Sequence, residues 1–209
     1  MRDPFCARLA GYAVTVAVLL PITAFAGLRS PPCDAPGIPS AYDSEIRQAA
    51  RRYLPVPYRD HPCGLKAQYW VESRLDAKAV SPAGAAGVAQ IMPATFKELK
   101  ALADIPGGKF VARTSIRLGA LHLSRQIRYW AAPRSAECRL ELAWASYNAG
   151  AGSITRAQIE SGGRRCWDSI APHLHWVTGV HAAETIAYVS RIWATWRRLR
   201  GWILTPSRG

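Results

Sequence analysis

Residues 69–96 read YWVESRLDAKAVSPAGAAGVAQIMPATF, and the rest of the chain is best interpreted around them. Apolar and aromatic side chains over residues 64–75 predict a helix with a polar end. The small residues that follow predict a turn in which Gly84 and Gly87 take a positive φ, which lets the backbone approach another surface closely. A second helix is expected to begin at Pro93. We therefore expect a helix, a tight turn and a helix at the centre of the fold.

One carboxylate, Glu72, lies near the end of the first of these helices and directly follows Tyr69, Trp70 and Val71. Aromatic and apolar neighbours remove water from a carboxyl group, and this desolvation raises its pKa. A glutamic acid in such surroundings can stay protonated near neutral pH and act as a general acid. Taken alone, a glutamate of this kind is more often an ordinary surface residue.

Three groups of residues change that interpretation, because their spacing and order match one known family. They are Glu72-Ser73, Ser81, Gly84-Ala85, Gly87, Gln90, Met92-Pro93 and Thr95, then Ser146-Tyr147-Asn148-Ala149-Gly150, then Glu184-Thr185 and Tyr188-Val189. The set resembles the signature of SLT-type lytic transglycosylases, members of the goose-type lysozyme superfamily, and extends over residues 64–198. It implies an all-α fold, a compact lysozyme-like helical domain with little or no β-structure.

The same resemblance implies an enzyme that cleaves the β-1,4 bond between N-acetylmuramic acid and N-acetylglucosamine in peptidoglycan glycan strands. Glu72 would be the single catalytic residue, first as general acid and then as general base, and the product would end in a 1,6-anhydro sugar. The residues expected to bind substrate are Ser73, Ser81, Gln90, Met92, Tyr147, Asn148, Glu184 and Tyr188. No metal and no cofactor is implied.

Roles within this set also follow from the resemblance. Ser73 and Ser81 are expected to form hydrogen bonds near the acid, and Gln90 is expected to orient the substrate or the acid through its amide. Tyr147 and Asn148 are expected to line the opposite wall and to contact the acetamido group of the sugar. Met92 is expected at the floor of the site, with ordinary packing as the alternative.

Four other positions carry more specific expectations. Glu184 and Tyr188 are expected to hold the last helix against the site, with simple packing as the alternative for Tyr188. Asp76 lies four residues after Glu72, where a helix would place it on the same face, but its position in the family pattern favours a local cap or salt bridge. Many relatives have larger residues before the glutamine, so the smaller Ala89 is expected to widen a sugar subsite.

The rest of the chain also predicts helices. Apolar residues at helical spacing favour helices over residues 43–53, 114–130, 137–147, 153–159 and 181–200. Asp43 or Ser44 is expected to cap the first of them. No strand-like alternation persists anywhere, which supports the all-α class. His173 and His175 form an HxH pair, but without a nearby carboxylate or cysteine they are expected to be surface loop residues rather than metal ligands.

The N-terminus predicts export. Arg2 and Arg8 give a basic start, residues 10–20 are apolar, and Ala24-Phe25-Ala26 matches an A-x-A cleavage site, the three parts of a secretory signal peptide. The apolar run is short for a transmembrane helix, so an uncleaved inner-membrane anchor is the alternative to a periplasmic or secreted protein. The expected layout is a signal peptide at 1–26, a Pro-rich leader at 27–40, the catalytic domain at 41–200 and a C-terminal tail at 201–209.

Removal of the signal peptide would leave four cysteines. An even number in an exported protein implies two disulfides, with three possible connectivities and free buried cysteines as the alternative. None of the spacings is CxxC, which argues against a zinc site. We expect Cys138 to pair with Cys166, across the segment that delivers Tyr147, and Cys33 to pair with Cys63.

The net charge limits the class of partner. The formal charge of +13 favours an acidic partner, which could be nucleic acid, anionic lipid or an anionic polymer such as the cell wall. Export favours the wall, and no nucleic-acid partner is expected. The alternatives are a non-catalytic basic helical module and a hydrolytic lysozyme-type muramidase. The protein is expected to be a monomer. If it is the enzyme that the resemblance implies, assistance to a secretion or conjugation machinery is a further possibility.

Overall fold

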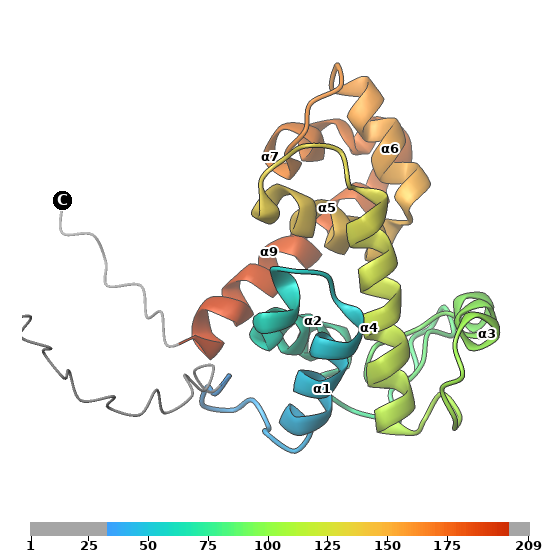
Figure 1. The fold of residues 1–209 in the computed structure, drawn as a ribbon. Helices are drawn as coiled ribbons and strands as arrows, with labels where there is room; N and C mark the ends of the chain where they lie inside the picture. Colours follow the sequence, from blue (N-terminus) through green and yellow to red (C-terminus); the bar gives the residue numbers. More distant parts are fainter. Residues whose placement is uncertain (1–32, 201–209) are drawn as a thin grey trace, which may run out of the picture.

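Two helices, α2 (Pro62–Ser73) and α3 (Pro93–Leu102), flank the small-residue turn in a computed structural model that describes residues 33–200 (Figure 1). The predicted order of helix, turn and helix is therefore confirmed. The predicted signal peptide, the leader up to residue 32 and the tail at 201–209 lie outside the described residues.

The remaining long helices lie where helical spacing predicts them. They are α1 (Asp43–Tyr53), α4 (Ala112–Tyr129), α5 (Ala136–Ala149), α6 (Ala151–Glu160) and α9 (Ala182–Leu199). Short helices were not predicted, because a helix of three or four residues shows no periodicity: η1 (Tyr58–Asp60), α7 (Trp167–Ile170), η2 (Ala171–His173), α8 (His175–Thr178) and η3 (Gly179–His181). Within residues 33–200, β-structure is limited to isolated bridges, so the all-α class is confirmed.

Helix α2 is central to the packing. It packs against α9 and α1, while α4 packs against α1 and α5 (Figure 1). Residues 62–69 are all buried, so α2 lacks a solvent face along most of its length. A helix buried on every side has few places for polar groups, and those that it carries need partners.

The buried Lys66 of α2 shows how one such group is satisfied. Its ammonium donates to the Cys33 carbonyl at 2.8 Å and lies 2.6 Å from the Asp43 carboxylate. The expectation that Asp43 or Ser44 caps α1 is wrong, because Tyr42 is the N-cap and no side chain caps the helix. The Asp43 carboxylate faces the buried Lys66 ammonium instead, where it offsets part of the free-energy cost of removing that charge from water.

Helix α4 comes unusually close to the turn at Gly119. A Cβ atom at this position would lie 2.4 Å from the Ala89 Cβ and 2.8 Å from the Tyr69 hydroxyl, so only glycine fits. Ala89 itself is fully buried. The expectation that Ala89 widens a sugar subsite is therefore wrong, since its methyl group faces the core, where its small size lets α4 approach the turn.

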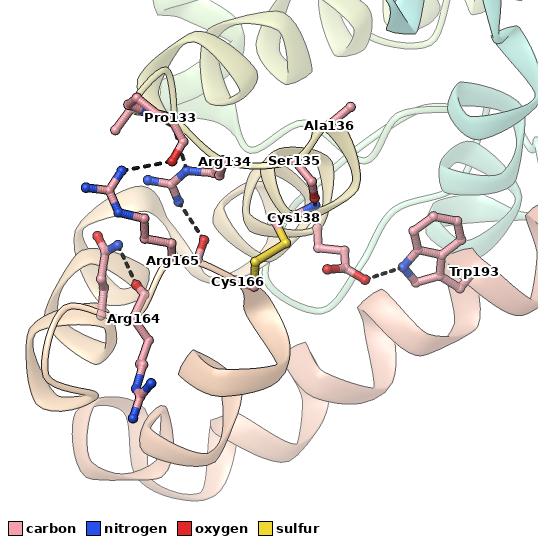
Figure 2. The surroundings of a disulfide bond; sticks show 12 residues. Pro133, Arg134, Ser135, Ala136, Cys138, Arg164, Arg165, Cys166 and Trp193 are labelled. Carbon is pink, nitrogen blue, oxygen red and sulfur yellow. Dashed lines mark hydrogen bonds between the residues drawn. A yellow bond between two sulfur atoms is a disulfide. The ribbon is translucent and has the colours of Figure 1, made fainter.

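Both predicted disulfides are present. Cys33 pairs with Cys63 across a Cα–Cα distance of 5.1 Å, and Cys138 pairs with Cys166 across 4.7 Å. Figure 2 shows the second bridge and the arginines around it: Arg134 donates to the Arg165 carbonyl, and Arg165 donates to the Pro133 carbonyl. The start of α5 and the segment before it are thus fastened to the segment before α7 by one covalent bond and two hydrogen bonds.

Among the helices of residues 33–200, none combines the length and the apolar character needed to cross a membrane.

Candidate active site

Glu72 occupies the last turn of α2 and meets α9 there. The Tyr188 hydroxyl of α9 donates a hydrogen bond to Glu72 Oε1 at 2.6 Å. Burial of the carboxyl group raises the pKa of Glu72 to about 8, although the hydrogen bond from Tyr188 and the charge of Arg191 both act to lower it. Desolvation wins because neither partner replaces the water that a carboxylate needs. Glu72 is therefore protonated near neutral pH, as the sequence predicts.

The chain reverses directly after Glu72. Arg74 and Leu75 have φ values of 58° and 65°, a left-handed conformation that ends α2. The Arg74 guanidinium lies over the Trp70 ring, 4.7 Å from its centroid, which supports this bend. Because the helix stops here, Glu72 is in its final turn and keeps one side partly exposed while its carboxyl group is desolvated.

The turn after α2 is held by its own side chains. Gly84 and Gly87 have the positive φ values that the sequence predicts, 88° and 77°. The Ser81 hydroxyl accepts from the Ala85 amide at 3.0 Å. The Gln90 side-chain nitrogen donates to the carbonyls of Ala79 and Gly87 at 3.2 and 2.9 Å. The nitrogen of this amide is thus used in shaping the turn, and within residues 33–200 its oxygen has no such role.

Ser73 and Tyr147 connect the turn to the neighbouring helices. The Ser73 hydroxyl donates to the Val88 carbonyl at 2.8 Å, and the Tyr147 hydroxyl donates to the Ala89 carbonyl at 2.8 Å. Ser73 lies beside the acid in sequence, but it donates to the turn rather than to Glu72. Tyr147 is close enough to the acid that burial, together with Glu72, raises the pKa of Tyr147. Their contacts with a substrate remain predictions.

The other predicted residues surround this centre. Asn148, exposed at the end of α5, accepts a hydrogen bond from the Thr185 hydroxyl of α9 at 2.7 Å. Met92 is 43% exposed before α3, and Glu184 is exposed in the first turn of α9, four residues before Tyr188. The structure therefore brings Glu72, Tyr147 and Tyr188 together, and it leaves three predicted residues open to solvent.

Sequence interpretation missed two charged or titratable residues near the site. Arg191 lies three residues after Tyr188 on α9 and influences Glu72, so helical spacing from Tyr188 would have found it. The His122 ring of α4 lies 4.6 Å from the Tyr147 ring. Burial, followed by the nearby Arg125, lowers the pKa of His122 to about 4, so this histidine is neutral at physiological pH.

The nearest acid in sequence does not lie beside Glu72. Asp76 is exposed, and its carboxylate accepts a hydrogen bond from the Lys78 amide at 2.8 Å, which makes it the local cap that the sequence predicts.

The histidine pair lies in short helices, and His175 Nδ1 is 2.7 Å from the Pro172 carbonyl. Over residues 33–200, no three histidine, cysteine or acidic side chains are grouped closely enough to hold a metal ion.

The comparisons with known proteins agree with this geometry. The Transglycosylase SLT domain model matches residues 56–170, which is more than half of the chain. The chain therefore belongs to the transglycosylase SLT family. A comparison with curated proteins found no match.

Solved structures of lytic transglycosylases share the fold. The 70 kDa soluble lytic transglycosylase of Escherichia coli is 24% identical with a TM-score of 0.63, and a complex of the 70-kDa soluble lytic transglycosylase with bulgecin A gives the same values. An inactive mutant of the lytic transglycosylase Slt from Pseudomonas aeruginosa is 25% identical with a TM-score of 0.62. Each match covers 79% of this chain and 25% of the other. This chain thus corresponds to about a quarter of those proteins, and the lysozyme-like helical fold is confirmed.

The raised pKa of Glu72 predicts a specific pH dependence of stability. The folded value of about 8 lies above the ordinary value of 4.5, so between these pH values the folded state binds a proton that the unfolded state has lost. The free energy of unfolding should therefore fall as pH rises through this window. Glu72→Gln removes the titration, so the variant should gain stability relative to the wild type on going from pH 5 to pH 8. Urea unfolding of both proteins at the two pH values measures this gain, and an unchanged difference would contradict the raised pKa.

Proposed function

We propose that this protein is an exported peptidoglycan lytic transglycosylase, which cleaves the bond between N-acetylmuramic acid and N-acetylglucosamine and leaves a 1,6-anhydro-N-acetylmuramic acid end. The observation that carries the proposal is the Glu72 carboxyl group, desolvated and hydrogen-bonded to Tyr188. Membership of the transglycosylase SLT family supports it, as do the similar structures, which are lytic transglycosylases.

The first step uses Glu72 as an acid. With its pKa near 8, the carboxyl group holds a proton at neutral pH and can give it to the glycosidic oxygen. The bond between C1 of the muramic sugar and this oxygen breaks, and the N-acetylglucosamine side leaves with a new hydroxyl. The acetamido oxygen of the muramic sugar stabilises the positive charge at C1, so the step needs no protein nucleophile.

The second step uses the same residue as a base. The Glu72 carboxylate takes the proton of the C6 hydroxyl, whose oxygen attacks C1 and closes the anhydro ring. Glu72 is then protonated again, and no water is consumed. The Tyr188 hydrogen bond and the Arg191 charge both favour the ionised form, which they would stabilise between the two proton transfers.

The surroundings of Glu72 favour this route over hydrolysis with two carboxylates. Most glycosidases place a second carboxylate on the other side of the scissile bond. Asp76 is exposed and caps its own turn, and the charged side chain that influences Glu72 is the cation Arg191. A single acid/base is sufficient when the attacking hydroxyl belongs to the substrate.

The contacts with substrate are also part of this proposal. Exposed Met92, Asn148 and Glu184 would contact the glycan strand directly, and Gln90 would contact it through its amide oxygen. Ser73, Ser81, Tyr147 and Tyr188 would act mainly by holding the turn and the acid in place, through the hydrogen bonds described above.

The cellular setting follows from the chain as a whole. We place the protein in the periplasm or outside the cell, as a monomer on the wall, after removal of residues 1–26; an uncleaved anchor in the inner membrane is the alternative. The two disulfides suit an oxidising compartment, and a net charge of +13 suits an anionic wall polymer. The domain at 41–200 would open the wall locally, for turnover or for a secretion or conjugation machinery.

Mass spectrometry of digested peptidoglycan tests the reaction. The protein lacking residues 1–26 should release anhydro-muropeptides, which lack one water and are about 18 Da lighter than the reducing products of hydrolysis. A muramidase that hydrolyses the same strands serves as the control for reducing ends. Reducing ends alone would identify a lysozyme-type hydrolase and refute the second step, whereas no release would refute the enzymatic function.

A further inference from the structure

Gln68 is a polar side chain whose position calls for an explanation. It lies in α2 and is fully buried, and neither its amide nitrogen nor its amide oxygen has a partner within hydrogen-bond limits. Buried amides are nearly always paired, because loss of water without a replacement is unfavourable. Gln68 lies outside the three sequence motifs, so the sequence gave it no role in the site.

The location of Gln68 relates it to the acid. It precedes Glu72 by four residues, so the two side chains lie on the same face of α2, one turn apart. Tyr188 of α9 packs against this face and donates its hydroxyl proton to Glu72 Oε1 at 2.6 Å. Burial, followed by Glu72, raises the pKa of Tyr188, and the amide of Gln68, which lies near the same hydroxyl, acts in the opposite direction. An uncharged amide lowers the pKa of a phenol by donating a hydrogen bond to its oxygen, which stabilises the ionised form.

The hydrogen-bonding capacities of the three groups fit one order. A tyrosine hydroxyl has one hydrogen to donate, which Tyr188 uses in its hydrogen bond to Glu72, and its oxygen lone pairs can still accept. A glutamine amide has two protons to give, and within residues 33–200 those of Gln68 meet no acceptor at full hydrogen-bond geometry. Hydrogen-bond donation can therefore run from the Gln68 amide to the Tyr188 hydroxyl, and from that hydroxyl to the Glu72 carboxyl group.

We propose that Gln68 is a positioning residue for the acid: its amide, which has no partner at full hydrogen-bond geometry, closes onto the Tyr188 hydroxyl and donates to it, and it thereby holds and polarises the group that hydrogen-bonds Glu72. Hydrogen bonds in a chain strengthen one another. Tyr188 is then a stronger donor to Glu72 and favours the ionised carboxylate. The last consequence rests on the proposed function, because the ionised form is the one that must act as a base.

The titratable and charged groups around Glu72 come from three helices. They are Tyr69 of α2, Tyr147 of α5, and Tyr188 and Arg191 of α9. Gln68 carries no charge, so a substitution there changes the pKa of Glu72 through Tyr188 rather than by removing a charge. This makes the effect separable from that of Arg191.

The test is the pKa of Glu72 in a Gln68→Met variant, which keeps the length of the side chain and removes the amide. Titration of ¹³C-labelled glutamate by NMR, with Glu72→Gln to assign the signal, reads this pKa without any activity. We expect Gln68→Met to raise it by roughly 0.5–1 unit. The matched control is Gln126→Met in α4, where another glutamine has a buried amide oxygen without a partner, and it should cause no shift.

A double-mutant cycle separates positioning from packing. In a Tyr188→Phe background, Gln68→Met should cause no further shift, because the hydroxyl through which it acts is gone. An unchanged pKa in a folded Gln68→Met protein, or an equal shift in both backgrounds, would overturn the proposal. If Gln68→Met does not fold, the wild type gives a second readout. A side-chain amide signal protected from exchange should shift over the pH range in which Glu72 titrates and lose that response in Tyr188→Phe; a constant signal would also overturn the proposal.

Activity adds a readout that distinguishes the two proposals. If the protein digests peptidoglycan, Gln68→Met should move the limb of the pH–rate profile that reports Glu72 in the same direction as the NMR value, and should change kcat more than KM. If the protein digests none, the proposed function fails while the NMR shift still decides the role of Gln68.

Discussion

Glu72→Gln is expected to abolish nearly all peptidoglycan cleavage while the protein folds normally. A positioned acid/base contributes about 10²–10⁴-fold to rate, and Glu72 would serve two proton transfers in one turnover. The variant should fold because the amide oxygen of glutamine can still accept from the Tyr188 hydroxyl, which lies 2.6 Å from the carboxylate in the wild type. Release of soluble muropeptides from purified peptidoglycan measures the loss.

Asp76→Asn is the matched control for this variant. It makes the same change from carboxylate to amide four residues away, at an exposed position that caps its own turn. Activity of Asp76→Asn should therefore stay near that of the wild type. A folded Glu72→Gln protein that retained a large part of the activity would refute the assignment of Glu72, and a strong loss in Asp76→Asn would indicate a second catalytic carboxylate.

Replacement of both Cys138 and Cys166 by serine is expected to lower the free energy of unfolding by about 3–4 kcal/mol, since the bridge closes a long loop and constrains the unfolded chain. The two cysteines are 28 residues apart in the sequence. The hydrogen bonds of Arg134 and Arg165 that span the same segments are exposed and should contribute little in the absence of the bridge (Figure 2). Urea unfolding of the oxidised wild type and of the double variant measures the difference.

The other disulfide provides a comparison for this prediction. Cys33 and Cys63 are 30 residues apart, so the chain-entropy contribution of their bridge should be nearly the same. Loss of the Cys138–Cys166 bridge should also reduce activity, because α5 carries Tyr147. Equal stability of the oxidised wild type and the Cys138/Cys166 double variant would contradict the predicted contribution of the bridge.

Local rules were sufficient for much of the fold. Gly84, Gly87 and Pro93 predicted the turn and the start of α3, because glycine takes a positive φ without strain and the fixed φ of proline suits the first turn of a helix. The short helices between residues 167 and 181 were missed, since three or four residues give no period. The pairing of Asp43 with Lys66 was missed as well. A helix cap can be predicted from neighbouring residues, whereas this ion pair joins α1 to α2 and depends on how the two helices pack.

The site was predictable to the extent that its residues belong to motifs. Glu72 and Tyr188 were both found, but they are 116 residues apart, and their hydrogen bond depends on how α9 packs against α2. Gln68 and Arg191 lie outside the motifs, and their relation to the acid exists only in the folded protein. Sequence alone therefore singled out Glu72 as the candidate acid, whereas the groups that set its pKa were found only in the structure.

The way the turn is held has a consequence for engineering. Ser73, Gln90 and Tyr147 all donate to backbone carbonyls of the same loop, and Gly119 leaves no room beneath it. Libraries that randomise these positions should return mostly insoluble protein. Changes aimed at a different glycan or stem peptide are better confined to exposed Met92, Asn148 and Glu184, where a new side chain displaces solvent and, at Asn148, one hydrogen bond from the buried Thr185.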